Sequence, residues 1–514
     1  MATALGLLAI FVRLALLPVS PFPLPRWHDE FSYLLASDTF SHGRLTNPTP
    51  PAADFVEAFH VLVRPTYMSK YPAAQGLVLA AGQVLFGRPW WGVLLSAGAM
   101  SATFFWALNG WLPRRWALLG GLAAALRFGA ADYFVDSYWG GAVAATGGAL
   151  VLGAVGRLLV RGDRQAYSAW YGLLLGAGGA ILVHSRPWEG FLFCVPFAAA
   201  LFARAATRGA RKHVAQALGA ALLPLALAGA FLLYDSTRVT GSAWKLPHRA
   251  YDEQYGAVSM FLIGCDAPAP PSRHPELRRF FTEWEPAALS PKTGRLASDW
   301  AVSVARWLRR VRPLAGAWVA AIAVAVLSRG RRLGLPVAAL VFFTSGLGLQ
   351  RYELLHYAAP ALALFVALQV AAWREVILRT GRAATPLIRG SFALAVVLFG
   401  VGAVSISACP VYGPVSLRQS IADLLEAKSG RHVVVVRYAV DHDVHFEFVY
   451  NRADVLRAKV IWLREPPEAE WAAVAAAFPR RLFWLFEPDR SGRLRPYPAG
   501  RSSTFPAPSS ASRP

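Results

Sequence analysis

The sequence predicts a polytopic α-helical membrane protein, and three observations support this fold class. Of the 514 residues, 55% are hydrophobic and 16% are charged, whereas about 25% of the residues of a soluble globular domain are charged. The 52 Lys and Arg residues exceed the 30 Asp and Glu residues, and Arg falls in short runs between long apolar stretches. Those stretches have the length of membrane spans. A basic protein that binds nucleic acid would instead cluster Lys and Arg on polar elements, so no nucleic-acid partner is expected.

Eleven apolar segments are long enough, on a generous count, to cross the membrane, because a spanning helix needs about 20 mainly apolar residues. They are residues 4–20, 90–110, 115–131, 141–160, 168–184, 189–204, 216–234, 313–328, 334–349, 356–373 and 388–408. A twelfth apolar run, 73–87, is shorter and contains several Gly and Gln residues. The sequence therefore predicts about eleven spans together with interfacial helices.

The charges of the loops predict their sides, because short cytoplasmic loops collect Lys and Arg. After residue 111, Arg-rich loops alternate with loops that carry most of the loop acids, and the acidic loops are expected outside: 132–140, 185–188, 235–312 and 350–355. The first loop, 21–72, is acidic as well, so 73–110 must cross once and 73–87 is predicted to be interfacial or re-entrant. One basic cluster at the end of an outside loop predicts an amphipathic interfacial helix, with Trp300, Arg306, Trp307, Arg309, Arg310 and Arg312.

The chain is predicted to have three parts: a membrane domain at 1–409, a small extracytoplasmic α/β domain at 410–490 and a disordered tail at 491–514. In the second part, helices are expected at 415–428 and 467–478. Strands are expected at HVVVVRYAV, VHFEFVY, AKVIWL and RLFWLFE. The tail has few apolar residues that could pack into a core.

The first outside loop carries the residues that point most directly to chemistry. His28, Asp29 and Glu30 are adjacent at the membrane surface. Neighbouring carboxylates can bind a divalent cation, or one of them can act as a general base; the alternative is a capped, solvated juxtamembrane helix. Arg64 and Lys70 follow as cations that could hold an anionic headgroup. Apart from a divalent cation, whose ligands are left unassigned, no cofactor is indicated.

Other outside turns also carry ionisable residues at the ends of spans, where each costs free energy unless it is paired or functional. Asp136 follows the third predicted span, and Arg186 and Glu189 lie between two spans. Arg186 and Glu189 could serve a substrate or simply pair with each other across one helical turn. Arg351 and His356 lie before a late span, in RYELLHYAAP.

Together these motifs resemble the GT-C glycosyltransferases, in particular the group of protein O-mannosyltransferases and lipid A aminoarabinose transferases. The resemblance rests on HDEFSY at 28–33, a Tyr-Pro entry at 71–72 into a short apolar helix, the acidic residue after the third span and the late RYELLHYAAP. It covers the layout of about residues 1–370. The sequence departs from the family at Asp136, which SYWGG follows in place of the usual basic and then acidic residue.

The resemblance implies an enzyme that takes a sugar from a polyprenyl-phosphate carrier outside the membrane, usually with inversion. By position, Asp29 matches the first-loop acid proposed as base or metal ligand, and Asp136 matches the second acidic position. The segment from Arg351 to Pro360 matches the region that holds the carrier phosphate.

We therefore expect a multi-pass glycosyltransferase of the plasma (inner) membrane, with its active site on the extracytoplasmic side and a glycan, lipid or protein acceptor. Asp29, Glu30 and Asp136 are the expected catalytic residues. The expected substrate-binding residues are Arg64, Lys70, Arg186, Glu189, Arg351 and His356.

Two alternatives remain open at the level of sequence. A transporter or flippase for a lipid-linked sugar would use the same cations without a base. Such proteins often have two related halves, and this sequence shows no such internal symmetry. A polymerase or ligase of surface polysaccharide would place its key Arg and His residues in a large late loop, as 235–312 does with His248 and Arg249.

Overall fold

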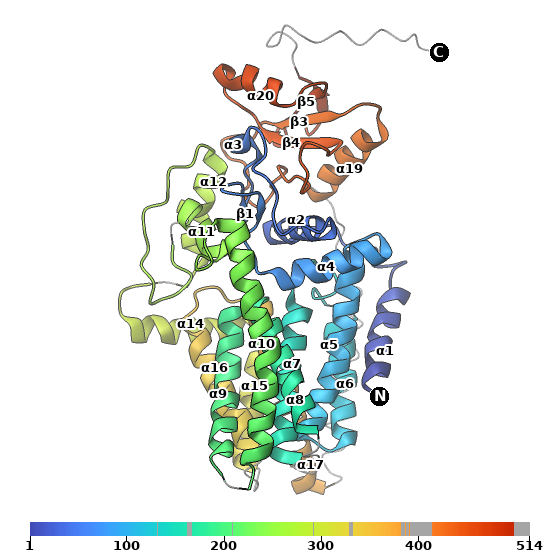
Figure 1. Cartoon of the computed structure of the whole chain (residues 1–514), viewed down its shortest axis with the longest axis vertical. Coiled ribbons are helices and arrows are strands. Elements are labelled where there is room, and N and C mark those ends of the chain that lie inside the picture. The colour runs from blue at the N-terminus through green and yellow to red at the C-terminus, as the bar shows by residue number, and fades with distance from the viewer. Residues whose placement is uncertain are drawn as a thin grey trace.

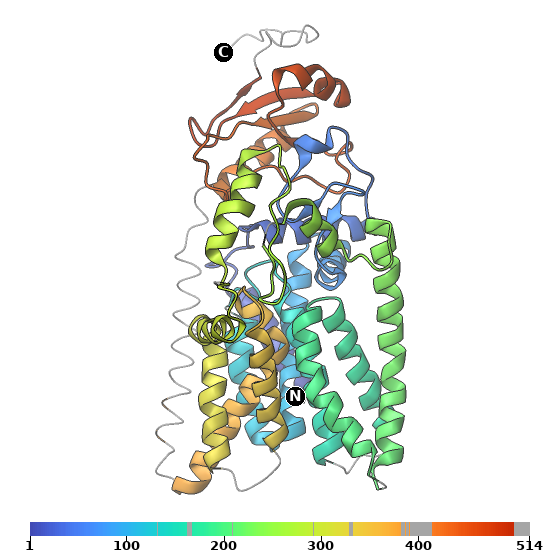
Figure 2. The same cartoon turned by 90° about the vertical axis from the view of Figure 1, so that its left-hand side faces the viewer.

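The computed structural model describes residues 1–130, 132–161, 167–207, 209–256, 258–290, 292–327, 333–381, 386, 390 and 414–497. Figure 1 shows a bundle of helices at one end of the molecule and a small α/β domain at the other, with segments of the first loop and of the large loop between them. The view turned by 90° shows the same three layers (Figure 2).

Among the described residues, five helices are long and apolar enough to cross a membrane. They are α5 (Trp90–Trp111), α7 (Gly141–Gly156, extended to Val160 by a π-helical turn), α9 (Pro187–Ala205), α10 (Arg211–Thr240) and α17 (Leu362–Thr380). A sixth span results if the bent pair α14 (Leu296–Arg310) and α15 (Arg312–Leu327) is counted as one. The protein is thus an integral membrane protein with a mainly helical fold.

Four of the predicted spans are shorter helices: α1 (Ala2–Ala15), α6 (Arg114–Gly129), α8 (Ser168–Val183) and α16 (Gly334–Leu347). Helix α4 (Ala73–Phe86) is equally short, and it lies in the run that was not expected to span. At a rise of about 1.5 Å per residue these helices extend roughly 21–24 Å, less than a hydrocarbon core of about 30 Å. The count of eleven spans is therefore not established, and the predicted segment 388–408 lies almost entirely outside the described residues.

Small residues allow the central helix α7 to approach its neighbours closely. A Cβ atom added at Gly148 would lie 1.8 Å from the carbonyl oxygen of Pro360, and one added at Gly147 would lie 3.0 Å from the carbonyl oxygen of Gly178. Without Cβ atoms the backbones can pack in contact, as is common between membrane helices. The segment before α17 is thereby held against the centre of the bundle.

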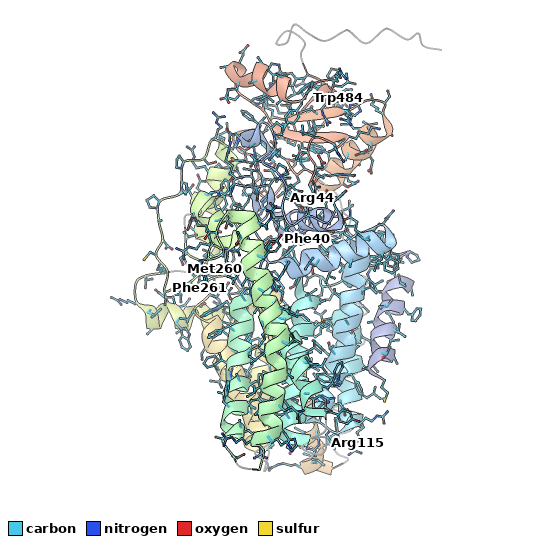
Figure 3. All side chains as sticks on the ribbon, in the orientation of Figure 1. Phe40, Arg44, Arg115, Met260, Phe261 and Trp484 are labelled. Atoms are coloured by element: carbon cyan, nitrogen blue, oxygen red, sulfur yellow. The ribbon has the colours of Figure 1, made fainter. Side chains whose placement is uncertain are left out.

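Two helices lie across the end of the bundle that faces the α/β domain, as the charge pattern predicts. Figure 1 shows α4 oriented across the bundle axis, and α14 meets α15 at an angle of 100°. The basic cluster on α14 is partly neutralised, because Arg306 and Arg310 both pair with the buried Glu353, at 3.2 Å and 2.9 Å. Figure 3 shows Arg115 at the opposite end of the bundle.

The outer loops contain short elements between the bundle and the α/β domain. They are α2 (His28–Ser41), α3 (Ala53–Val56), β1 (Val61–Leu62), β2 (Met68–Ser69), α11 (Pro247–Tyr255), α12 (Pro275–Arg279) and α13 (Glu285–Ala288). Strands β1 and β2 form an antiparallel hairpin. Helix α2 packs on α4, which places the start of the first loop directly above the bundle.

The α/β domain has a four-stranded sheet in the order β4-β3-β5-β6, made of Val460–Arg464, His432–Val436, Leu482–Phe486 and Leu494–Pro496. The central strand β3 is parallel to both of its neighbours, and β6 is antiparallel to β5. Every residue of β3 is buried, which agrees with its continuous apolar sequence. Helices α19 (Pro414–Ala427) and α20 (Trp471–Ala477) lie where the sequence predicts helices.

The predicted strand VHFEFVY, at 444–450, is wrong. The segment has no strand, because side chains satisfy its backbone in place of a neighbouring strand. The carboxylate of Glu447 accepts the N–H groups of Phe448 (2.9 Å) and Val449 (2.7 Å), and Arg418 donates to the carbonyl groups of Phe448 and Tyr450.

The predicted start of a disordered tail at residue 491 is also corrected, since β6 lies within that segment and residues 498–514 lie outside the described part of the chain.

The α/β domain shares a hydrophobic core with the first loop. Leu35 and Phe55 of that loop belong to the same buried cluster as Val433 and Ile461. The domain and the first loop are therefore packed as one unit above the bundle.

Candidate functional site

Asp29 lies in the first turn of α2, at the junction of α2 and α4. Its side chain is partly buried, and its carboxylate accepts a hydrogen bond from the hydroxyl of Tyr71. Tyr71 precedes α4, and its ring stacks on that of Tyr33, with centroids 4.6 Å apart. Asp29 has no ion pair with any residue that the structure describes. The packing of α2 on α4 thus positions one carboxylate beside two tyrosine rings.

Glu30, the adjacent carboxylate, is held by the backbone. Oε1 accepts the N–H groups of Arg26 (3.0 Å) and Trp27 (3.3 Å), and Oε2 accepts the N–H of Tyr138 (2.9 Å). Burial raises the pKa of Glu30 to about 7. Glu30 therefore caps α2 and attaches the start of this helix to the loop after α6, while Asp29 points to Tyr71.

Asp136, the third expected carboxylate, is neutralised by a cation. Its Oδ1 accepts a hydrogen bond of 2.6 Å from Arg13, whose side chain is fully buried in α1. Arg13 also donates to the carbonyl oxygen of Ser20 at 2.9 Å. This pair connects the first helix with the loop that carries Tyr138, so Asp136 and Glu30 support the same loop.

Arg186 directly precedes α9 and is one of two expected substrate-binding cations, Lys70 being the other, for which the structure describes no carboxylate partner. Its guanidinium lies over the ring of Tyr357, 4.4 Å from the centroid, and it forms no ion pair with the residues that the structure describes. Burial raises the pKa of Tyr33 to about 12, and the charges of Arg186, Asp29 and Glu189 act on the same hydroxyl. The three charged groups therefore surround one tyrosine.

Lys70 is the second of these cations. Its side chain is buried, and its Nζ lies 4.5 Å from the ring centroid of Tyr251 and 5.4 Å from that of Tyr71. It too has no ion pair in the described parts of the chain. Since Tyr71 contacts Asp29, the expected residues Asp29, Lys70 and Arg186 are brought to one tyrosine-lined site.

Glu189 lies close to this site but is not paired with Arg186 in the described structure. Its Oε1 accepts a hydrogen bond of 3.0 Å from the side-chain amide of Gln350, and it is buried. The alternative that Arg186 and Glu189 neutralise each other is therefore not what the structure has. Glu189 connects the start of α9 with the segment after α16.

Arg351 is occupied by the large outer loop. Its guanidinium donates to the carbonyl oxygens of Ser290 (2.9 Å) and Ser259 (3.1 Å) and pairs with Asp266 at 3.2 Å. Only about 4% of Arg351 is exposed. The guanidinium fastens the loop at 235–312 to the end of the bundle.

Arg64 and His356 also have polar partners of their own. Arg64 lies on the β1–β2 hairpin and pairs at 2.7 Å with Asp54, and both side chains are about half exposed. His356 is buried, and its Nδ1 lies 3.2 Å from the hydroxyl of Tyr133. Burial, and then the charge of Arg186, hold the pKa of His356 well below its ordinary value. A neutral imidazole does not supply a positive charge for a substrate phosphate, which is the group that the motif at 351–360 was expected to hold.

Sequence reasoning noted Tyr33 and Tyr71 in the motifs but gave them no role in the site, and it missed one buried arginine. Tyr71 and Tyr33 line the site, but their roles depend on a contact between residues 42 positions apart. Arg464 of β4 is fully buried, pairs with Glu276 and Glu447, and donates to the carbonyl oxygen of Glu57 at 3.0 Å. It joins the first loop, the large loop and the α/β domain. An Arg in an otherwise apolar strand was the available signal.

The described residues do not fit a metal centre. No group of three His, Cys, Asp or Glu side chains within the described ranges is arranged to hold a metal ion. The nearest polar partner of Asp29 is the Tyr71 hydroxyl, a donor and not a second carboxylate.

Comparisons with known proteins identify the fold. No family model matches the chain, and no curated protein matches it in sequence. The structure of ArnT, a lipid A aminoarabinose transferase, from Cupriavidus metallidurans bound to undecaprenyl phosphate matches with a TM-score of 0.50 at 14% identity, covering 89% of this chain and 85% of that one.

An oligosaccharyltransferase of Archaeoglobus fulgidus matches as well. Its apo form has a TM-score of 0.50 at 11% identity, covering 91% of this chain and 65% of the other, and its complex with Zn and sulfate also reaches 0.50 at 11% identity, covering 94% and 67%. Both neighbours are GT-C glycosyltransferases. The chain therefore has the GT-C fold, as the sequence motifs predicted.

Proposed function

We propose that this protein is a membrane glycosyltransferase that moves a sugar from a polyprenyl-phosphate carrier to a hydroxyl of an acceptor. The observation that carries this proposal is the grouping of Asp29, which lacks a described cation partner, with Arg186 and Lys70, which lack described carboxylate partners, around the rings of Tyr33 and Tyr71. The GT-C fold and the undecaprenyl phosphate bound to one neighbour support it.

Asp29 is the general base of this reaction. Its carboxylate takes the proton of the acceptor hydroxyl while the hydroxyl oxygen attacks the anomeric carbon of the donor sugar. The bond between that carbon and the carrier phosphate oxygen breaks, and the electron pair stays on the phosphate. Attack opposite to the leaving phosphate inverts the anomeric centre. The hydrogen bond from Tyr71 holds the Asp29 carboxylate in one orientation.

Arg186 and Lys70 stabilise the negative charge that the carrier phosphate gains as it leaves. The ring of Tyr357 covers one face of the Arg186 guanidinium, which leaves the N–H groups at the edge of the fork for two phosphate oxygens. In a poorly solvated site such a charge interaction is stronger than it would be in water.

Three of the other expected residues, Glu30, Asp136 and Arg351, act on the position of these groups. Glu30 and Asp136 fix the start of α2 through Tyr138 and Arg13, and Arg351 fastens the large loop. No step of this mechanism uses a metal ion, because the donor set around Asp29 does not form a metal site.

The side of the membrane follows from the loop charges. The site lies at the end of the bundle crossed by α4 and α14, whereas Arg115 marks the opposite end (Figure 3). Since short cytoplasmic loops collect Arg, we place the site on the extracytoplasmic side of the plasma (inner) membrane, where it meets a glycan, lipid or protein acceptor.

The test uses the full chain in lipid vesicles with a panel of radiolabelled polyprenyl-phosphate sugars. A transferase releases free polyprenyl phosphate and passes the label to an acceptor or to water. A transporter moves the intact lipid-linked sugar to the other leaflet without cleavage. Movement of intact donor with no carrier release across the panel would overturn the proposal.

A further inference from the structure

A cavity in the α/β domain lies apart from the tyrosine-lined site. It has a volume of about 490 Å³, within the range of about 300–1,000 Å³ typical of small-ligand sites. Three segments build it: the start of α19, the loop that replaces the predicted second strand, and the turn after β5. Its lining includes Leu417, Ser420, His442, Phe446, Pro488 and Asp489.

The lining combines apolar faces with fixed hydrogen-bonding groups. Phe446, which is 40% exposed, shares the lining with the apolar side chains of Leu417 and Pro488. The Asp489 carboxylate is held from two sides: Oδ1 contacts Nδ1 of His442 at 2.7 Å, and Oδ2 accepts the N–H of Ala439 at 3.0 Å. A carboxylate can accept about four hydrogen bonds, so Asp489 retains acceptor capacity for a ligand.

His442 orders the loop that carries the aromatic ring. Its Nε2 lies 3.0 Å from the carbonyl oxygen of Phe446, while its Nδ1 contacts Asp489. The ring of Phe446 and the carboxylate of Asp489 are thereby fixed relative to each other. Such preorganised groups lose little conformational freedom when a ligand binds.

The charge of the lining limits the class of ligand. Among the described residues that line the cavity there is no Lys or Arg, and both ring nitrogens of His442 already face acceptors, the Asp489 carboxylate and the Phe446 carbonyl oxygen. A phosphate or other anion therefore finds no cationic N–H group there that is not already engaged. A sugar ring presents an apolar face of C–H groups to an aromatic side chain and hydroxyl groups to a carboxylate and a serine. A neutral saccharide therefore fits the lining provided by Phe446, Asp489 and Ser420.

Aromatic side chains connect the cavity with the start of α2. Phe446 also lines a small hollow that His28 borders, and His28 directly precedes Asp29. Trp27, which is 46% exposed, packs its ring against His445 with centroids 5.9 Å apart. Exposed rings thus continue from the cavity towards the helix that carries the proposed base.

We infer that this cavity binds a neutral saccharide portion of the acceptor. The inference rests on the proposed transferase function, because it assigns the acceptor subsite of that reaction. A saccharide seated between Phe446 and Asp489 extends along Trp27 towards α2 and presents its terminal hydroxyl there. The acceptor is then a glycan or a glycan-bearing molecule.

The experiment measures binding without turnover. The full chain in nanodiscs is titrated with neutral gluco-, manno-, galacto- and N-acetylglucosamine trisaccharides, and binding is followed by saturation-transfer NMR. At least one probe is expected to bind, and Phe446→Ala and Asp489→Asn each weaken its affinity about tenfold, the size expected for a lost aromatic contact or charged hydrogen bond. The matched control is Asp423→Asn. Asp423 is an exposed carboxylate on α19, the helix that contributes Leu417 and Ser420 to the lining, and its replacement should leave affinity unchanged.

The outcomes separate this inference from the transferase proposal. Binding that persists in Asp29→Asn and is lost in Phe446→Ala places the saccharide in the cavity, whether or not sugar transfer is observed. Absence of binding to every probe overturns the inference, as does binding that Phe446→Ala and Asp489→Asn leave intact. Carrier release by wild-type protein would then still support the transferase. Equal melting temperatures of the variants show that they are folded.

Discussion

Tyr71 donates its phenolic hydrogen to the carboxylate of Asp29, and the two residues reach each other from the segment before α4 and from the first turn of α2. The contact depends on the packing of α4, which crosses the end of the bundle, on α2, the first helix of the outer loop. A hydroxyl donor orients a carboxylate without neutralising its charge. The Asp29 carboxylate can therefore still accept a proton from a second hydroxyl.

Asp29→Asn is expected to abolish most of the turnover. The amide keeps the shape of the side chain but cannot accept a proton, and a positioned base contributes roughly 10²–10⁴-fold to the rate. Carrier binding should remain, because Arg186 and Lys70 are unchanged. Carrier release and carrier binding are measured together, and near-normal release by Asp29→Asn would exclude this residue as the base.

Tyr71→Phe is expected to reduce turnover by about 10-fold while carrier binding is maintained, since the Asp29 carboxylate loses the hydroxyl that orients it and a hydrogen bond to a charged group contributes about 1.5–3 kcal/mol. Tyr33→Phe is the matched control, because its hydroxyl has no hydrogen-bond partner among the residues that the structure describes. Single-turnover release rates distinguish the two variants. Equal losses in both would argue against a specific role for the Tyr71 hydroxyl.

Arg186→Ala is expected to weaken carrier binding strongly, and Arg186→Lys to restore it only in part, because Lys lacks the planar fork that can contact two phosphate oxygens. Arg351→Ala provides the contrast. Its guanidinium contacts Ser290, Ser259 and Asp266, so this change should lower the melting temperature. It should lower carrier affinity less than Arg186→Ala does. A larger loss of affinity in Arg351→Ala than in Arg186→Ala would reverse the assignment.

The comparison of these two arginines shows what the sequence could and could not predict. Apolar run lengths and loop charges predicted the helical membrane fold and the placement of α4 and α14 across the bundle. The motif at 351–360 suggested a phosphate site, but local sequence cannot show that Arg351 contacts a loop about 60 to 90 residues away. The sequence left two equal interpretations of Arg186, and only the structure shows that its guanidinium lies over Tyr357 while Glu189 accepts the side-chain amide of Gln350.

The strand predicted at 444–450 is wrong for a related reason. Its alternating pattern is typical of a half-buried strand, but Glu447 and Arg418 satisfy its backbone groups. Periodicity reports which residues are buried and not which groups accept their hydrogen bonds. Asp29 was predicted from its place in the first loop, whereas the tyrosines around it required the tertiary structure.

Glu30 should make stability depend on pH near neutrality. Burial raises the pKa of Glu30 to about 7 from an ordinary 4.5. The contribution of this group to the free energy of unfolding is therefore fully present below pH 4.5, its pKa in the unfolded chain. That contribution is lost as the pH rises through about 7. Each unit of pKa difference corresponds to about 1.4 kcal/mol. The melting temperature of wild type, measured relative to Glu30→Gln, should fall between pH 5 and pH 8. Parallel profiles for the two proteins would contradict this.

Arg464 should be the largest single contributor to the attachment of the α/β domain. Its buried guanidinium pairs with Glu276 and Glu447, and removal of one partner from a buried ion pair costs about 3–5 kcal/mol because the other charges stay behind without compensation. Arg464→Met is therefore expected to lower the melting temperature clearly and to speed hydrogen exchange in α12, which carries Glu276.

The matched control for that change is Arg273→Met, because Arg273 also bridges the large loop and the α/β domain through Glu470, at 2.8 Å and 3.0 Å, but with both side chains well exposed. Solvent screens such a pair, so its loss should change melting and exchange little. If Arg464→Met and Arg273→Met give the same melting temperature and the same exchange in α12, burial does not determine the strength of this attachment. A rate of carrier release that falls with Arg464→Met at temperatures well below its melting point would show that the α/β domain also holds α2, and with it Asp29, in the position that the reaction needs.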